Sequence, residues 1–320
     1  MLVTSYRRPE QLAACLDGIR SQTRPAEEVV VVNHASDRDT ADVVARLRAG
    51  WPALRSATVA EDGSVAALNC GLSVASEPIV AIVDDDAVPK PDWLQRIVAT
   101  YARDERIAAV GGRDIVVDKG RVVGPPKNHF PGQGADPTRV GQIQWFGRML
   151  ANHHIGVGPA RDVDVLKGAN MSVRRGAVAG HGYDERLRGV GAVVHSELSI
   201  CLPLRRQGYR IVYDPEIVVT HYQAARPHGD HRTSVELVAA ASHNEALQIL
   251  DYFGPSRWPV FAVWSVAVGT TEAPGLAVLL RDLIRRRPAA VSRFVASQRG
   301  RAAAWGTRRS ARRTSSAPNC

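Results

Sequence analysis

Three consecutive aspartates, at positions 84–86, carry the strongest chemical signal in the chain. They follow an all-apolar run at 79–83, which is typical of a strand covered on both faces. Three carboxylates this close repel one another, and a divalent cation that prefers oxygen ligands would relieve the repulsion. An acidic turn that caps the next helix is an equally ordinary interpretation, so the triplet alone leaves both open.

Other polar clusters lie where further strands are expected to end or helices to begin, at residues 4–9, 33–37 and 63–72. In α/β proteins, ligands bind at the carboxyl ends of the parallel strands. Together with the aspartates, these clusters predict a nucleotide pocket along one edge of a sheet.

The elements that must position these residues alternate in the first half of the chain. Apolar runs predict strands at 2–5, 29–32, 79–83 and 107–111, and helical spacing predicts helices near 9–19, 40–47, 64–75 and 93–101. This order predicts a mainly parallel sheet with helices on both faces.

The second half is less regular. A hairpin is expected at 116–123, followed by a long connection over 125–162. Further strands are expected at 163–167, 171–175, 210–213 and 217–220, and helices at 196–207 and 235–250. The segments 260–268, 276–284 and 289–295 are apolar with basic flanks, and composition predicts disorder after Trp305.

Charge is concentrated at the end of the chain. The 320 residues carry a formal net charge of +9, yet residues 281–320 hold 11 arginines and one acid, and the other 280 residues hold 30 basic and 31 acidic side chains. The body is therefore near neutral, which excludes a chain-wide nucleic-acid groove and predicts no specific nucleic-acid partner.

The four cysteines are isolated, so the sequence excludes a zinc ribbon or a dithiol redox motif. We expect no signal peptide, because no basic segment precedes an apolar one at the start. The longest apolar run, 258–269, is too short for a bilayer span of about 20 residues. A cytoplasmic protein is the expectation.

Six segments, in order, resemble an inverting glycosyltransferase of family 2 with the GT-A fold, and the resemblance covers residues 2–225. The matching segments are Thr4 to Pro9, Val32 to Asp37, Asn69-Cys70-Gly71, Asp84-Asp85-Asp86, Gly168 to Arg175, and a block from Ser196 through Gly208-Tyr209-Arg210 to His221. The resemblance implies a Rossmann-like nucleotide-binding sheet merged with a smaller acceptor-side subdomain, followed here by C-terminal helices.

It also implies roles for individual residues. The nucleotide-sugar would contact Thr4, Tyr6, Arg8, Asn33, Ser36, Asp37, Asn69, Gly71, Asp84 and Asp85. Asp86 and His221 would hold Mg²⁺ or Mn²⁺, although a histidine bonded to a backbone carbonyl is the alternative for His221. The acceptor side would include Asn170, Arg188 and Gly189, and Glu197 would be the catalytic base.

Three departures from the family pattern matter. The acids expected beside the base are Ser196 and Ser199. The nucleobase-binding aspartate is replaced by Asn33, whose carbonyl can still accept a hydrogen bond from a uracil or thymine N–H, so a UDP- or dTDP-linked donor is expected. The first strand is short, and we expect the natural start to lie upstream.

The sequence thus predicts a metal-dependent sugar transferase acting on a hydroxyl of a glycan or lipid-linked acceptor, in polysaccharide, glycolipid or cell-envelope glycan synthesis. Expected parts are a donor half (1–112), an acceptor and catalytic half (113–254), amphipathic helices (255–304) and a disordered basic tail (305–320). The basic end predicts contact with an anionic membrane surface, at the inner face of the plasma membrane. A catalytically impaired binding protein and a nucleotidyltransferase remain the alternatives.

Overall fold

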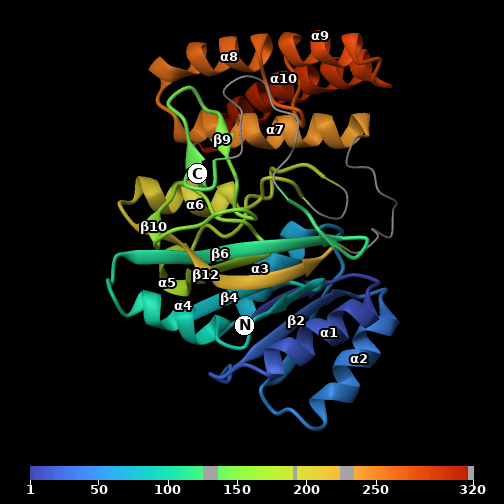
Figure 1. The fold of residues 1–320 in the computed structure, drawn as a ribbon, viewed down its shortest axis with the longest axis vertical. Helices are drawn as coiled ribbons and strands as arrows, with labels where there is room; N and C mark the ends of the chain where they lie inside the picture. Colours follow the sequence, from blue (N-terminus) through green and yellow to red (C-terminus); the bar gives the residue numbers. More distant parts are fainter. Residues whose placement is uncertain (125–135, 190–192, 224–233, 316–320) are drawn as a thin grey trace.

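The structure is a computed structural model that describes residues 1–124, 136–189, 193–223 and 234–315. These residues form one ten-stranded mixed sheet (Figure 1). Eight strands follow the order β10-β12-β6-β11-β4-β1-β2-β3, while β5 pairs with β12 and β7 pairs with β6. A separate pair is formed by β8 (Gln142–Ile143) and β9 (Met149–Leu150). The mixed α/β fold agrees with the sequence-based expectation.

The first part of the chain contains four neighbouring parallel strands. These are β1 (Leu2–Ser5), β2 (Val29–His34), β3 (Leu54–Val59) and β4 (Ile79–Asp84), connected by α1 (Pro9–Arg20), α2 (Arg38–Arg48) and α3 (Ser64–Val74). After β4 come the short β5 (Ala87–Pro89) and α4 (Trp93–Tyr101). The sequence analysis missed β3, because it is an edge strand whose exposed residues, such as Arg55, break the apolar run.

Alternating side chains of the central strands fill two cores, one on each face of the sheet. Val30 and Val32 of β2 belong to the core that also contains residues of α3 and α6 (Leu198–Arg206). Val31 belongs to the opposite core, which contains residues of α1, α2 and α4. Burial on both faces explains why the strand sequences are continuously apolar, and it fixes the edge at which their polar ends gather.

The second half of the chain extends the same sheet. The strand β11 (Asn170–Arg174) runs antiparallel between β4 and β6 (Ile107–Asp118), and β12 (Arg210–Tyr222) runs parallel to β6. The flanking elements are β7 (Arg121–Val122), β10 (Arg161–Asp162) and α5 (Arg175–Val178).

Two strand expectations in this half need correction. The two strands predicted at 210–213 and 217–220 are one strand with an irregularity between Asp214 and Val218. The strand predicted at 163–167 is absent from the described residues 163–167, because Val163, Val165 and Leu166 are buried as an apolar loop.

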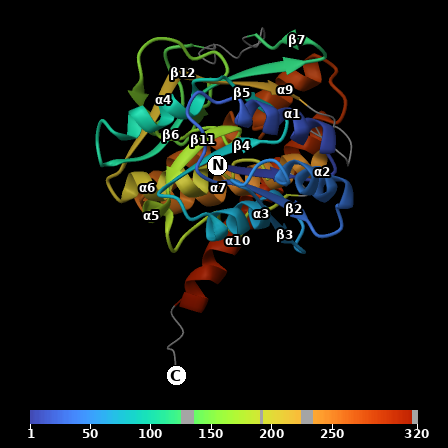
Figure 2. The ribbon, with the colours of Figure 1, turned by 90° about the horizontal axis from the view of Figure 1, so that it is seen from below.

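The last described residues form a helical layer on α7 (Val235–Tyr252), which we call the C-terminal cap (residues 255–315). It comprises a 3₁₀ turn (Pro255–Arg257), α8 (Trp258–Ala267), α9 (Leu276–Ile284) and α10 (Ala290–Ser315) (Figures 1 and 2). A Cβ on Gly300 would lie 2.2 Å from the backbone oxygen of Ala239, so glycine lets α10 approach α7 closely.

The structure of the cap differs from the disordered tail that the sequence predicted. Disorder after Trp305 is wrong for residues 305–315, which continue α10, while residues 316–320 lie outside the described part. The expected boundaries between parts of the chain after residues 112 and 304 fall inside β6 and α10, respectively. No helix in the described residues is both long and apolar enough to cross a bilayer.

Candidate functional site

Two carboxylates and an imidazole converge at the carboxyl edge of the sheet. Asp84 is the last residue of β4, and Asp86 lies in the turn that leads to β5. Because β12 pairs with β5, His221 stands opposite Ala87 and next to that turn. One ligand atom from each of Asp84, Asp86 and His221 lies within 4.8 Å of the others.

His221 is oriented by two acidic neighbours. Its Nε2 lies 3.0 Å from an oxygen of Asp86, and its Nδ1 lies 3.4 Å from Asp114 Oδ2. Burial disfavours a charge on this imidazole, but its hydrogen bonds to Asp114 and Asp86 outweigh burial and raise its pKa to about 10. Asp114 is fully buried and also pairs with Lys167. Although burial opposes its ionisation, the contacts with His221 and Lys167 lower the pKa of Asp114 to about 2.

These residues fit a divalent cation. Carboxylate oxygens suit Mg²⁺ and Mn²⁺, and imidazole is also accepted by Mn²⁺. A carboxylate at Nδ1 with Nε2 facing the ligand cluster is the usual arrangement around a metal-binding histidine. Burial, and then the charge of Asp86, raise the pKa of Asp84, which a cation would reverse. The buried Oδ1 of Asp114 has no hydrogen-bond partner among the described residues. This carboxylate, beside the cluster of Asp84, Asp86 and His221, therefore keeps an unused acceptor.

The middle aspartate points elsewhere. Asp85 accepts hydrogen bonds from Ser5 Oγ at 2.8 Å and Arg8 Nη1 at 3.0 Å, and the same guanidinium nitrogen lies 3.3 Å from Asp86. Burial raises the pKa of Asp85 to about 6. Both oxygens of Asp85 are thus engaged within the chain, and it ties the end of β1 to the turn after β4. The expectation that Asp85 contacts the donor is not supported, whereas Asp84 joins the cation cluster.

The end of β2 offers an unused acceptor. The amide nitrogen of the buried Asn33 donates to the backbone oxygens of His34 and Asp37, at 3.1 and 3.2 Å. Its Oδ1 has no partner among the described residues. The Tyr6 ring packs edge-on against His34, 5.7 Å between centroids, and the Ser36 hydroxyl lies 2.8 Å from His34 Nδ1. Thr4 lies on β1 in register with Asp84. These predicted donor residues therefore gather at one edge.

Three other predicted donor residues hold the scaffold. Asp37 caps α2, where it accepts from Thr40 and from the backbone N–H of Arg7. Asn69 exchanges two hydrogen bonds with the backbone of Tyr183, at 2.7 and 2.9 Å. A Cβ on Gly71 would lie 2.2 Å from the side chain of Leu2, so this glycine lets α3 pack on β1.

Asn170, which was predicted on the acceptor side, is instead buried within the sheet. It has no exposed surface, accepts from Trp93 Nε1 at 2.8 Å, and donates to the backbone oxygens of Arg113 and Ile217. A side chain that is sealed and fully bonded in this way cannot touch an acceptor. Its role is to join β11 to β6, β12 and α4.

Glu197 stands at the start of α6 as its N-cap, with a half-buried side chain. Burial raises its pKa to about 7, and the charges of Lys167 and Asp84 act on it with opposite signs. A carboxylate with this pKa can take and release a proton near neutrality. The neighbouring His195 is buried, which lowers its pKa to about 4 and keeps it neutral. The charge of Asp84 also acts on Glu197, which links this carboxyl group electrostatically to the cation cluster.

The segment before Glu197 is clamped from α7. The side chain of Asn244 accepts from the backbone N–H of Arg188 and donates to the backbone oxygens of Arg188 and Val194, each at 2.8–2.9 Å. Arg188 and Gly189 are exposed, as an acceptor contact requires. The clamp fixes both ends of the segment on which these two predicted acceptor residues lie.

Sequence reasoning missed Asp114, Lys167 and Asn244. An ionisable residue inside an apolar strand, as Asp114 is in β6, was the one available signal. Nothing local marks Lys167 or Asn244, because their partners lie far away in the sequence.

Comparisons with known proteins agree on a family. An uncharacterised glycosyltransferase of a Nostoc species is 26% identical over 132 residues, which cover 39% of this chain and 41% of the relative. A glucosyl-dolichyl phosphate glucuronosyltransferase of Haloferax volcanii is 27% identical over 158 residues, which cover 47% of this chain and 45% of the relative. The chain thus matches less than half the length of these curated relatives.

Two solved structures share the fold. A mannosyltransferase of Pyrobaculum calidifontis, solved with GDP-mannose and Mn²⁺, superimposes with a TM-score of 0.55 at 19% identity over 96% of this chain and 85% of its own. TarS of S. aureus, solved with UDP-GlcNAc, gives 0.56 at 15% identity over 98% and 91%. The family model described as Glycosyl transferase family 2 matches residues 1–163. With half of its length matched by that model, the chain belongs to glycosyl transferase family 2.

Proposed function

We propose that this chain is a metal-dependent, inverting glycosyltransferase that moves a sugar from a nucleotide-sugar to a hydroxyl acceptor. The observation that carries the proposal is a juxtaposition. Asp84 of the cation cluster formed by Asp84, Asp86 and His221 acts electrostatically on Glu197, whose pKa of about 7 suits a general base.

In this mechanism, Glu197 takes the proton of the acceptor hydroxyl. The acceptor oxygen forms a bond to the anomeric carbon from the side opposite the diphosphate, and the bond from that carbon to the phosphate oxygen breaks with its electron pair. A cation held by Asp84, Asp86 and His221 would supply charge neutralisation for the leaving diphosphate. A single displacement inverts the anomeric centre and needs no covalent sugar intermediate. Burial of Glu197 keeps its basicity matched to neutral pH.

We propose a UDP- or dTDP-linked donor. The support is Asn33, whose partnerless Oδ1 can accept the N–H of uracil or thymine. The Tyr6 ring packs against His34, the residue that follows Asn33 in the chain. Mg²⁺ and Mn²⁺ are both compatible with the carboxylates, and the histidine favours Mn²⁺.

The acceptor we propose is a glycan or a lipid-linked saccharide, in polysaccharide, glycolipid or cell-envelope glycan synthesis. We place the protein in the cytoplasm, peripheral at the inner face of the plasma membrane. The arginine-rich end of the chain supports this location.

The test is a product analysis with UDP-, dTDP- and GDP-linked sugars in the presence of Mn²⁺. We expect release of the nucleoside diphosphate, first by slow donor hydrolysis and faster with an acceptor, and an inverted anomeric configuration by NMR. Release of pyrophosphate in a parallel reaction of a nucleoside triphosphate with a sugar 1-phosphate would instead identify a nucleotidyltransferase. Donor binding without any turnover, across the panel, would identify the impaired binding protein that Ser196 and Ser199 leave open.

A further inference from the structure

The two outer helices of the cap point apolar side chains outward. On α8, Pro259, Val263, Val266 and Ala267 are exposed, and on α9 so are Leu276, Leu280, Leu283 and Ile284. In each helix the exposed positions follow the spacing i, i+4, i+7, i+8, so they form one stripe. Ile284 is 83% exposed, Val263 69% and Leu280 60%.

The opposite side of each helix is buried, and it includes polar groups. Phe261 and Ser265 face inward on α8, and Val278 and Asp282 face inward on α9. A helix of a water-soluble protein normally turns its apolar stripe to the core and its charges to water. Because the exposed stripes of α8 and α9 carry no charge, these helices have the inverse arrangement.

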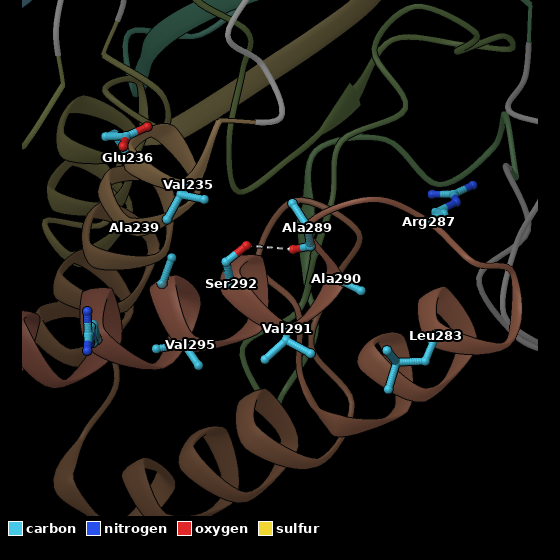
Figure 3. Close-up of a pocket in the computed structure, with 12 residues that line it drawn as sticks. Val235, Glu236, Ala239, Leu283, Arg287, Ala289, Ala290, Val291, Ser292 and Val295 are labelled. Carbon is cyan, nitrogen blue, oxygen red and sulfur yellow. Dashed lines mark hydrogen bonds between the residues drawn. The ribbon is translucent and has the colours of Figure 1, made fainter.

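The stripe continues into a groove. Val291 and Val295 of α10 are exposed, and with Leu283 they line a groove of about 720 Å³ between α7, α9 and α10 (Figure 3). Arg287 and Arg299 also border it. Figure 1 places α8 and α9 in the layer farthest from the sheet. We define the cap face by its exposed apolar residues, which are Val263, Val266, Leu276, Leu280, Leu283, Ile284, Val291 and Val295.

The rim of the cap face is positively charged. Arg285, Arg286 and Arg287 follow α9 directly, and all three are exposed. Asp282 is buried and already pairs with Arg281 and Arg293, while the other described acid of the cap, Glu272, lies in the turn between α8 and α9. Within the described chain no carboxylate pairs with Arg285 or Arg286, so their charge is available to an external anion.

We propose that the cap face docks on an anionic lipid leaflet, with the apolar stripes at the headgroup–acyl boundary and the arginines among the lipid phosphates. Apolar side chains with basic residues at their border are the composition of helices that lie in a membrane interface. A second copy docked face to face fits less well, because it would bring Arg285, Arg286 and Arg287 of both copies together, with only Glu272 and the groove residue Glu236 as exposed acids nearby. The docking rests on the membrane location proposed above and names its surface, and it is independent of which sugar is transferred.

The experiment is flotation of the full chain with vesicles of phosphatidylglycerol and phosphatidylcholine, and with pure phosphatidylcholine vesicles, without donor or acceptor. Wild type should bind the anionic vesicles, and binding should weaken as salt rises. Replacing Arg285 and Arg286 by Gln should lower the partition coefficient roughly thirty-fold, because each nearby arginine contributes substantially to leaflet binding. Replacing Leu280 and Ile284 by Gln should lower it at least about ten-fold.

Matched controls change the same chemistry elsewhere. The pair Arg46→Gln and Arg48→Gln removes two exposed arginines from α2, and Val74→Gln with Val122→Gln removes two exposed apolar side chains away from the cap. Both controls should bind like wild type. Equal loss in the controls, or equal binding to neutral vesicles, would overturn the proposal. The proposal would also be overturned if the wild type failed to bind vesicles and instead formed a dimer that dissociates when Leu280 and Ile284 are replaced by Gln. Donor hydrolysis, measured on the same samples, reports on the proposed transfer activity separately.

Discussion

The acidic edge of the sheet and the C-terminal cap both bury charged side chains, and they satisfy them in different ways. In the cap, Arg301 donates to the backbone oxygens of Ser265 and Ala273, and the buried Asp282 pairs with Arg293. At the sheet edge, the charge of Asp86 raises the pKa of Asp84, although Asp86 is itself paired with His221 and Arg8.

This difference in the partners of buried charges distinguishes a structural region, the cap, from a candidate binding site, the sheet edge. A buried charge with internal partners stabilises one conformation, and it has little capacity left for a ligand. Converging carboxylates repel one another, and a bound cation relieves that repulsion, so they retain capacity for a ligand even where one of them has an internal partner. Partner arrangement, more than residue type, therefore distinguishes the arginines of the cap from the aspartates of the edge.

The largest effect is expected from changes to the cation cluster of Asp84, Asp86 and His221. Asp86→Ala, or excess chelator with wild type, should reduce sugar transfer to background, because Asp86 is one of three groups proposed to hold the cation. Turnover measured with the identified donor checks this, with Asp118→Ala, an exposed aspartate on β6, as the control. Full turnover of Asp86→Ala with an unchanged melting temperature would remove the cation assignment.

Replacing the proposed base gives the next largest effect. Glu197→Gln keeps the shape of the side chain and removes its basicity, so transfer should fall roughly 10²–10⁴-fold with donor affinity nearly unchanged. Glu185→Gln, an exposed change in the same half, should be silent. If His195→Ala proves more damaging than Glu197→Gln, then the base has been placed on the wrong residue.

A smaller effect should come from Asp114, which contacts the cluster through His221. Asp114→Asn keeps the size of the side chain and weakens its hold on the imidazole, so Mn²⁺ affinity should fall about 10–100-fold. Isothermal titration of Mn²⁺ without substrate measures this directly. An unchanged affinity would show that Asp114 serves only the ion pair with Lys167.

The mildest test varies pH. Because the folded-state pKa of Glu197 is raised to about 7, the carboxylate is protonated below that pH and inactive as a base. We expect kcat/KM to rise about tenfold per pH unit up to pH 7 and then to level off. In Glu197→Gln the residual rate should lose this step, and its persistence would assign the step to another group.

The sheet edge was largely predictable from the sequence, because parallel strands bring their polar ends together wherever those residues stand in the chain. Asp84 and Asp86 stand out in this way, whereas His221 was predicted from the resemblance to the family. Asn170 was misplaced, because a motif gives the position of a residue on a strand and does not tell whether its amide faces a substrate or the interior. Asp114 and Lys167 were missed, since their meeting depends on tertiary contacts alone.

The cap was less predictable for a different reason. The spacing of apolar residues in α8 and α9 is the same whether the stripe faces a core or the solvent, so pattern alone cannot orient it. The predicted disorder after Trp305 failed because an arginine-rich composition is also compatible with a packed helix. Arg308, for example, is buried on α10 and bonded to Asp251.

The polar residues of α7 also bear on how the molecule unfolds. Ser242 and His243 hydrogen-bond to Ser297 and Thr307 of α10, while their neighbour Asn244 holds the segment that leads to Glu197. One helix therefore shares its bonds between the cap and the catalytic half. We expect heat to melt both in a single cooperative transition, with equal calorimetric and van 't Hoff enthalpies, because neither half can open without leaving the polar side chains of α7 without partners.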